Sequence, residues 1–362
     1  MGMTEFPLND PLAIQRWSTA LAVYAAKAAY FAKFIGKGND SLIIVKDELS
    51  KGAGEKITFG IRGKLAHPGI EGDNVIEGHA TGEEALSFFN DSVFIDQLRK
   101  GTKSKGKMSE QRVPYNLRAE GRDALTVWWS EEMDEELFAY LSGARGINVD
   151  FHQPTTWTGR ANNALTAPDA AHVIYGGDAT GKGDLASGDN MTLGLVERLV
   201  AKAETTDPMI QPFMVNGEKK FVLLMHTFQA YQLRTSTTEN DWMDIQKASA
   251  GATGDKARFY KNSLGEYADV ILHKHRNCIR FSDYGTTGDV TAARALFLGA
   301  QAGVIAYGQD SATGRYSWHE EMDDRGNALA ITSGSIFGIK KVRYNSKDFG
   351  VIAVDTYCPV VS

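Results

Sequence analysis

The sequence predicts a mixed α+β fold built around one long helix. Small and apolar residues recur every four positions from Leu117 to Leu141, which places them in one slowly turning helical stripe. Asn116 is the expected N-cap and Gly143 the expected stop, so the helix should cover residues 116–142, about 39 Å at 1.5 Å per residue. Extended segments flank this helix on both sides: Ile57, Phe59 and Ile61 alternate with Thr58, Gly60 and Arg62, as in a strand.

The totals describe an ordinary folded protein. The chain has 362 residues, 43% of them hydrophobic and 23% charged, which argues against disorder. Its net charge of −6 argues against a general nucleic-acid-binding protein. Two cysteines make no disulfide framework and fit a reducing compartment. The sequence shows neither a membrane-length apolar run nor a secretory signal, so we expect a soluble product with no membrane partner.

The N-terminal stretch from Asp10 to Gly36 has the pattern of an amphipathic helix. Its seam is formed by residues that follow one another at steps of three and four: Trp17, Leu21, Tyr24, Ala28, Phe31 and Ile35. The stretch is basic, so a membrane-surface helix or a transit peptide is an alternative. We favour packing against protein, because most apolar helix stripes are buried in a core.

Residues 56–107 predict a long two-stranded ribbon with a glycine-rich tip. A ribbon of this kind has no core of its own and is only marginally stable alone. It must therefore lie along its own domain or be completed by a neighbouring subunit.

The charges of this region are segregated. The tip is acidic (Glu71, Asp73, Glu77, Glu83, Glu84), the end of the return strand is basic (Arg99, Lys100, Lys103, Lys105, Lys107), and the long helix carries a second acidic run (Glu131, Glu132, Asp134, Glu135, Glu136). Charge runs of this kind are most often solvated faces that contribute little energy. The alternative is charge complementarity between copies of the chain, which would set register more than affinity.

The remainder predicts alternating strands and short helices. Strands are expected at 172–175, 270–275, 336–344 and 349–356, helices at 191–205 and 226–234, and a hairpin around Asn216-Gly217. Residues 291–307 are small and apolar, and fit either a helix or a buried strand.

No motif predicts catalysis or a cofactor. Gly176 to Lys182 resembles a phosphate-binding loop, but Gly183 stands where a hydroxyl should bind Mg²⁺ and the following residues would not open a helix. His273 and His275, with Cys278 nearby, lack the further ligands of a zinc site. We therefore expect no catalytic, cofactor-binding or metal-binding residues. A structural role is favoured, in which repeated copies exchange arms.

Four blocks carry a family resemblance. Residues 40–65, 89–118, 263–277 and 349–356 resemble the major capsid proteins of tailed bacteriophages, in the branch typified by short-tailed virulent phages. The resemblance covers nearly the whole chain, and residues 91–118 are its most specific part. It implies the fold shared by tailed-phage and herpesvirus coats, with an N-arm (1–45), an extended β-hairpin loop (46–109), a peripheral domain (110–185 and 336–362) and an axial domain (186–335).

The resemblance also implies a function. Copies of the chain would form the hexamers and pentamers of an icosahedral phage head that encloses double-stranded DNA without sequence-specific binding. Because the predicted first helix begins close to Met1, a separate scaffolding protein is expected, together with a portal and, in some heads, decoration proteins. The protein would be assembled in the host bacterial cytoplasm and located in the virion. The alternatives are an encapsulin-like compartment shell and a nucleotide-dependent enzyme that uses the Gly176–Lys182 loop.

The expected contact residues between subunits lie in three groups. The first is the N-terminal seam (Trp17, Leu21, Tyr24, Phe31). The second is the ribbon charges (Glu71, Asp73, Glu77, Arg99, Lys100, Lys103, Lys105, Lys107). The third is the acidic edge of the long helix (Glu131, Glu132, Glu135).

Overall fold

The structure is a computed structural model. It describes residues 29–47, 54–62, 65–78, 81–112, 116–160, 162–215, 217–235, 263–309 and 315–360. No helix in these ranges is long and apolar enough to cross a membrane.

The long helix, α3 (Leu117–Ser142), is confirmed with both of its predicted ends. The Asn116 side chain accepts hydrogen bonds from the backbone N–H groups of Arg118 and Ala119. Gly143 ends the helix with a φ of 70°, and a Cβ at this position would lie 2.1 Å from the carbonyl oxygen of Thr166. Only glycine combines this left-handed backbone with so close an approach.

A six-stranded sheet lies against α3. Its order is β1 (Ile35–Gly36), β2 (Ile43–Lys46), β15 (Gly303–Tyr307), β17 (Ala328–Lys341) and β16 (Tyr316–Asp323), and β5 (Asp96–Lys103) also pairs with β17. β17 is long enough to pair with β5 and β16 along its first part and with β15 along its last part. Trp129 of α3 donates a hydrogen bond to Ser333 of β17 at 3.2 Å, which fixes the helix on this sheet.

A second sheet of eight strands forms the rounded part of the molecule. Its order is β11 (Ser263–Tyr267), β12 (Val270–Lys274), β10 (Glu218–Met225), β14 (Val290–Leu298), β20 (Val351–Tyr357) and β8 (Val173–Tyr175), while β13 (Arg280–Tyr284) pairs with β14 and β9 (Phe213–Val215) pairs with β10. The helices of this part are α4 (Leu193–Thr205) and α5 (Thr227–Thr235). The hairpin predicted at residues 216–217 is confirmed, because β9 and β10 pair across it.

The eight-stranded sheet is buried on both faces. On β10, Val222 and Leu224 belong to the core that contains the C-terminal half of α3, whereas Leu223 and Met225 belong to the core that contains α4. Successive strand residues face opposite sides, so a nearly continuous apolar run is what this position requires. The helix α3 therefore packs against both sheets and joins them.

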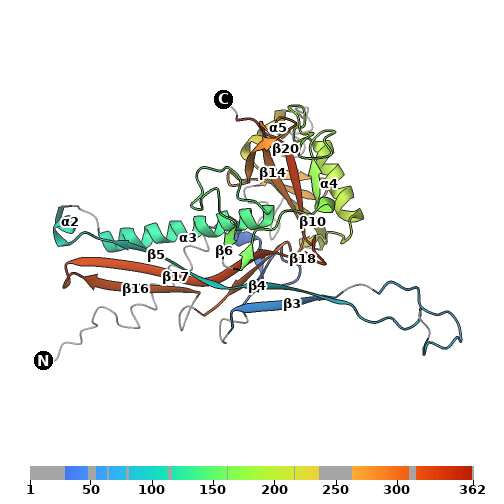
Figure 1. The fold of residues 1–362 in the computed structure, drawn as a ribbon, viewed down its shortest axis with the longest axis horizontal. Coiled ribbons are helices and arrows are strands. Elements are labelled where there is room, and N and C mark those ends of the chain that lie inside the picture. Colours follow the sequence, from blue (N-terminus) through green and yellow to red (C-terminus); the bar gives the residue numbers. More distant parts are fainter. Residues whose placement is uncertain are drawn as a thin grey trace.

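The remaining elements are short, apart from one projection. β3 (Lys56–Arg62) and β4 (Phe88–Phe94) form a two-stranded ribbon. The others are η1 (Tyr30–Lys33), α2 (Lys107–Arg112), η3 (Ala170–His172) and the strand pairs β6 (Gly159–Arg160) with β7 (Asn163–Ala164) and β18 (Arg343–Tyr344) with β19 (Lys347–Asp348). Beyond β3 and β4 the chain extends far from the body as a narrow loop (Figure 1).

Three sequence predictions are corrected. The N-terminal helix does not continue to Ile35, because residues 30–33 form a 3-10 turn and β1 then pairs in parallel with β2. Of the two alternatives for residues 291–307, buried strand is confirmed and helix is wrong, but the segment forms two strands, β14 and β15, and not one. The ribbon is shorter than predicted, since residues 96–103 leave β3 and pair with β17 instead.

Each sheet takes strands from distant parts of the chain. β15, β16 and β17, which fall mostly within 186–335, belong to the sheet beneath α3. β20, within 336–362, belongs to the eight-stranded sheet.

Candidate assembly surfaces

The end of the N-terminal segment is anchored on α3. The backbone N–H groups of Tyr30 and Phe31 donate to the carboxylate of Asp134 at 2.6 and 3.1 Å. Phe31 is fully buried, and its ring meets that of Phe138 edge-on with the ring centres 4.8 Å apart. Phe31 was predicted as a contact between subunits, but it is part of the core of its own subunit. Trp17, Leu21 and Tyr24 lie outside the described residues.

Asp134 makes this anchor sensitive to pH. Burial raises the pKa of Asp134 to about 7, although the two backbone hydrogen bonds lower it and the neighbouring Glu135 and Glu131 raise it further. In the unfolded chain this carboxyl titrates near its ordinary value of 3.8. Between these two values the folded subunit holds a proton that the unfolded chain has released.

We expect the free energy of unfolding of the unassembled subunit to fall as pH rises from about 4 to about 7, with Asp134 contributing up to about 1.4 kcal/mol per pH unit. The contribution is complete below the unfolded pKa and is lost as pH rises through the folded pKa. Urea unfolding of the unsubstituted protein and of Asp134→Asn at several pH values in this window measures it. The Asn variant should show a shallower slope. Asp73→Asn, on the exposed tip, is the control and should keep the original slope; equal slopes for all three proteins would contradict the assignment.

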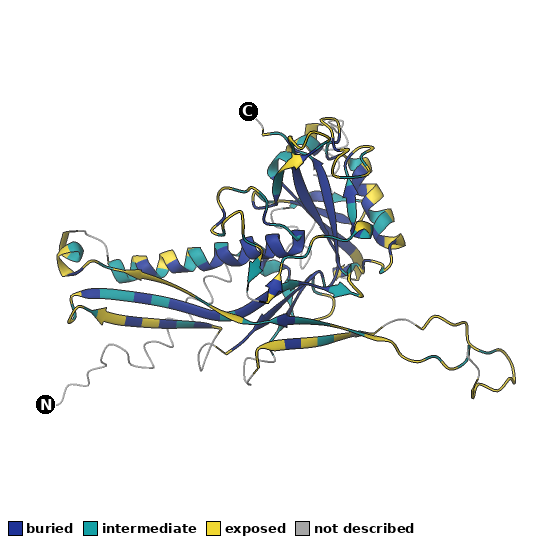
Figure 2. Ribbon diagram, viewed as in Figure 1, coloured by how far each residue is buried: buried dark blue, intermediate teal, exposed yellow. Residues whose placement is uncertain are grey.

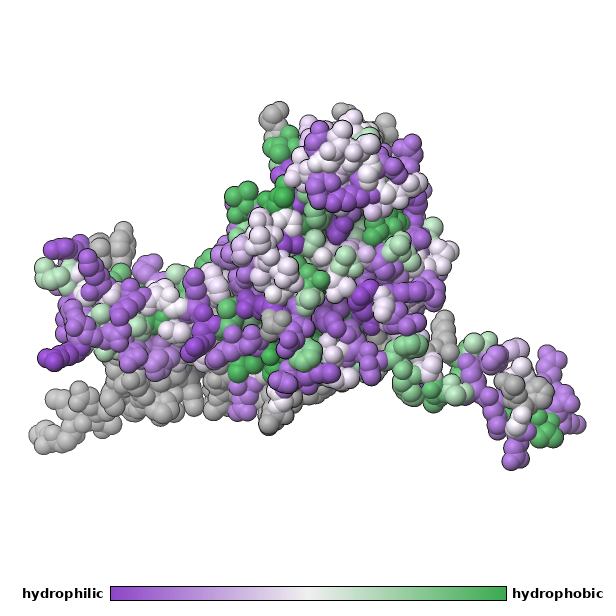
Figure 3. Space-filling view, in the orientation of Figure 1, coloured by the Kyte–Doolittle hydropathy of each residue, from purple (hydrophilic) through white to green (hydrophobic). Residues whose placement is uncertain are grey.

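The loop beyond β3 and β4 exposes apolar side chains. We call residues 65–78 and 81–88 the projecting segment. Five of its large apolar residues are more than half exposed: Leu65, Val75, Ile76, Leu86 and Phe88. Most of the segment is solvent-exposed (Figure 2), and hydrophobic atoms gather on it among hydrophilic ones (Figure 3). A surface of this kind is typical of a protein–protein contact.

Acidic side chains of the projecting segment accept hydrogen bonds from its own backbone. Glu84 accepts hydrogen bonds from the backbone N–H groups of Ala66 and His67 at 2.7 and 3.1 Å, and these bonds hold its pKa below the ordinary value. Glu83 accepts from the N–H of Gly78 at 3.1 Å. The predicted contact residues Glu71, Asp73 and Glu77 are exposed on the same tip.

The predicted basic residues lie mainly on β5, at the other end of the molecule from the tip. Lys103 pairs with Asp323 of β16 at 2.5 Å, and the ammonium of Lys100 lies 5.3 Å from the ring centre of Trp128. Arg99, Lys105 and Lys107 are exposed. The acidic tip and the basic strand are thus far apart in one subunit (Figure 1).

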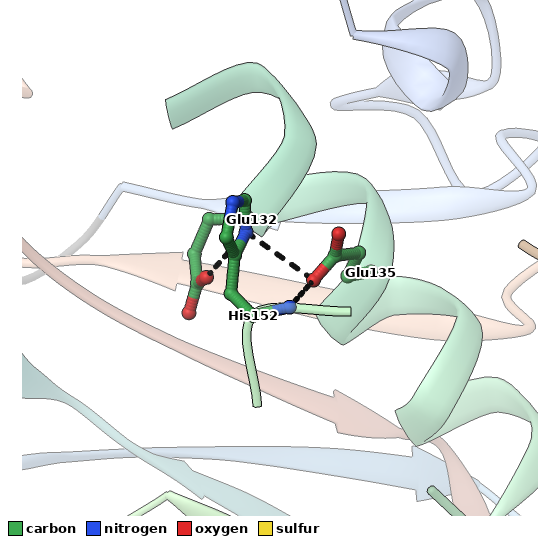
Figure 4. A group of neighbouring side chains, drawn as sticks. All are labelled: Glu132, Glu135 and His152. Carbon is green, nitrogen blue, oxygen red and sulfur yellow. Dashed lines mark hydrogen bonds and ion pairs between the residues drawn. The ribbon is translucent and has the colours of Figure 1, made fainter. Parts of the chain in front are cut away.

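The acidic edge of α3 is largely buried, which corrects the prediction of an open acidic surface. Glu132 and Glu135 are 1% and 4% exposed, whereas Glu131 remains partly exposed. Residues 145–160 fold over them: Arg160 forms ion pairs with Glu132, at 2.7 Å, and with Glu136. His152 lies between Glu132 and Glu135 (Figure 4). Burial raises the pKa of Glu136 to about 8 despite the opposing effect of Arg160.

A family model described as phage capsid protein matches residues 5–360. The chain belongs to the phage capsid protein family. This capsid protein is 42% identical to a chain of the solved capsid of Ralstonia phage GP4, with 100% of each chain covered and a TM-score of 0.87. A curated major capsid protein of Pseudomonas phage KPP25 is 27% identical, with 93% of each chain covered. The capsid asymmetric unit of cyanophage Pam1, at 19% identity and a TM-score of 0.72 over 92% of this chain and 93% of that one, shares the fold.

These likenesses confirm the tailed-phage capsid fold predicted from the sequence. The protein is a major capsid protein of a phage head, it assembles with copies of itself into a shell, and it is part of the virion. Its family is one of structural proteins, in agreement with the prediction that it is not an enzyme.

The two enzyme-like motifs have structural roles in the capsid protein. Lys182 of the glycine-rich loop pairs with Asp283 at 2.6 Å, and the residues after it form turns, since the next helix begins only at Leu193. The ring of His275 lies 4.5 Å from that of Tyr30, centre to centre, and burial lowers the pKa of His275 to about 4. Among the described residues, His273, His275 and Cys278 do not form a cluster of converging ligand atoms.

The capsid protein also contains a buried ion pair with its hydrogen bonds, which we call the buried joint and which was not predicted from the sequence. The Arg294 guanidinium donates two hydrogen bonds to the Asp355 carboxylate, both at 2.7 Å, and a third to the carbonyl oxygen of Ser142 at 2.9 Å. Tyr284 donates to Asp355 at 2.7 Å. The joint ties the end of α3 to the eight-stranded sheet.

Proposed function

We propose that the chain forms the hexamers and pentamers of an icosahedral head that encloses double-stranded DNA. In this proposal the projecting segment lies over a neighbouring subunit, which covers its exposed apolar residues. The observation that supports it is the segment itself: it extends far beyond its own subunit and exposes Val75 and Ile76 by 71% and 56%. Exposed apolar side chains on so narrow a projection are typical of a surface that another protein covers.

The peripheral and axial assignments belong to the same proposal. The part formed by α3 and the six-stranded sheet would lie at the periphery of each capsomer, and the part formed by the eight-stranded sheet would face its axis. A separate scaffolding protein, a portal and assembly in the bacterial cytoplasm complete the proposal. Clustered exposed charge on β5 supports further contacts between copies.

Replacing Val75 and Ile76 with aspartate is expected to abolish shells while leaving the subunit folded. Neither side chain contributes to the described core clusters, but a central apolar contact is typically worth about 2–4 kcal/mol at an interface. A loss of about 2 kcal/mol weakens each association roughly 30-fold, and the effect repeats at every contact of a shell. Electron microscopy of the purified variant measures shell yield, and circular dichroism checks that the subunit is folded.

Val149→Asp is the matched control, because Val149 is 94% exposed but lies outside the projecting segment. It is expected to leave shell formation intact. Normal shells from the Val75→Asp, Ile76→Asp variant would refute the proposed role of the segment. Heads that contain protein cargo instead of DNA would favour the compartment-shell alternative.

A further inference from the structure

The buried acidic cluster on α3 has the composition and geometry of a cation site. Glu132 and Glu135 stand one turn apart on the helix, and His152 reaches over both of them from the loop that follows (Figure 4). One ligand atom from each of the three residues lies within 4.8 Å of the other two. The His152 side chain is 31% exposed, so the cluster has an entrance from solvent.

The cluster brings three buried carboxyl groups close to one guanidinium. Arg160 pairs with Glu132 and Glu136, whereas Glu135 faces His152. The Oε2 atom of Glu132 is buried and has no hydrogen-bond partner, and it lies 3.4 Å from Nδ1 of His152. Buried carboxylate oxygens are normally hydrogen-bonded, paired or bound to a metal. This oxygen is therefore available as a ligand atom on the side that faces His152.

The two separations from His152 match those of metal ligands. Nδ1 of His152 lies 3.4 Å from Oε2 of Glu132 and 3.3 Å from Oε2 of Glu135. Zinc binds imidazole nitrogen and carboxylate oxygen at about 2.1 Å, and two ligands of a tetrahedral ion at that distance lie about 3.4 Å apart. A nitrogen ligand among the oxygens favours a transition metal over Mg²⁺ or Ca²⁺, which prefer oxygen ligands.

We propose that Glu132, Glu135 and His152 bind one divalent transition-metal ion, of which Zn²⁺ is the natural probe, with water at the fourth position. The surroundings would orient these ligands as second-sphere groups usually do. Arg160 and Gln153 hold the other oxygen of Glu132, and the backbone N–H of His152 donates to Glu135 at 2.8 Å. Glu131 faces the remaining ring nitrogen of His152 at 3.8 Å. The bound ion would tie the loop at residues 145–160 to α3 and so stabilise the subunit.

The test is metal binding by the purified protein after treatment with a chelator. Isothermal titration with Zn²⁺ is expected to show one site per chain, and Co²⁺ is expected to give the intense visible absorption of a tetrahedral complex. His152→Gln, and separately Glu132→Gln with Glu135→Gln, should weaken binding about 100-fold or more, since loss of a second-sphere partner alone typically costs 10- to 100-fold. His319→Gln is the matched control, because His319 is 64% exposed on β16.

Two outcomes would overturn the site. The first is the absence of stoichiometric Zn²⁺ binding by the unsubstituted protein. The second is equal affinity in His152→Gln and His319→Gln. If the double Glu variant does not fold, a density map of Zn²⁺-treated heads decides the question, since the ion should appear between the three ligands. Shell formation is a separate readout, so failure here would not bear on the proposed assembly.

Discussion

Replacing Asp355 with alanine is expected to lower the free energy of unfolding of the unassembled subunit by about 3–5 kcal/mol. The carboxylate is fully buried and accepts hydrogen bonds from Arg294 and Tyr284. Its removal would leave the guanidinium of Arg294 buried without a counter-ion. Burial, together with Asp355, also raises the pKa of Tyr284, which keeps that hydroxyl a neutral donor. Chemical denaturation followed by circular dichroism measures the loss.

The matched control is Asp323→Ala, which removes an ion pair with Lys103 on the surface. The side chains of Lys103 and Asp323 are both exposed to solvent. We therefore expect no measurable loss in the free energy of unfolding. Similar losses for Asp355→Ala and Asp323→Ala would show that the buried joint has no special importance.

Replacing Trp129 with alanine is expected to cost about 3–5 kcal/mol of subunit stability. The indole is fully buried between α3 and the six-stranded sheet, with its ring centre 5.0 Å from that of Tyr316 and 6.2 Å from that of Phe337. Its removal opens a cavity and leaves Ser333 without the indole N–H donor. Denaturant unfolding at constant pH measures the change.

Trp128→Ala provides the comparison on the same helix. Trp128 is only partly buried and lies beneath Lys100, so a loss of about 1–2 kcal/mol is expected. If the Trp128 variant were as unstable as the Trp129 variant, the face of α3 that carries Trp129 would not be the one that packs on the six-stranded sheet.

The sequence predicted local structure well where neighbouring residues determine it. The ends of α3 depend on Asn116 and Gly143, which act within a few residues of themselves, and its stripe depends on a repeat of four. The hairpin between β9 and β10 is determined in the same local way. These signals need no knowledge of distant chain segments.

Burial and strand pairing could not be predicted, because they depend on distant partners. The run from Glu131 to Glu136 looks like a solvated face until Arg160, some 24–28 residues later, folds over it. Strand β5 looks like the rest of a ribbon until β17, more than 220 residues later, pairs with it. The exposure of the projecting segment could have been predicted, since apolar side chains in a glycine-rich tip have no core to enter.

Electron cryomicroscopy of the purified protein is the decisive experiment on assembly through the projecting segment. We expect closed shells in which residues 65–78 and 81–88 of each copy lie on a neighbouring copy, with Val75 and Ile76 covered. A small monodisperse monomer, or shells in which this segment extends into solvent without contacting another subunit, would contradict it.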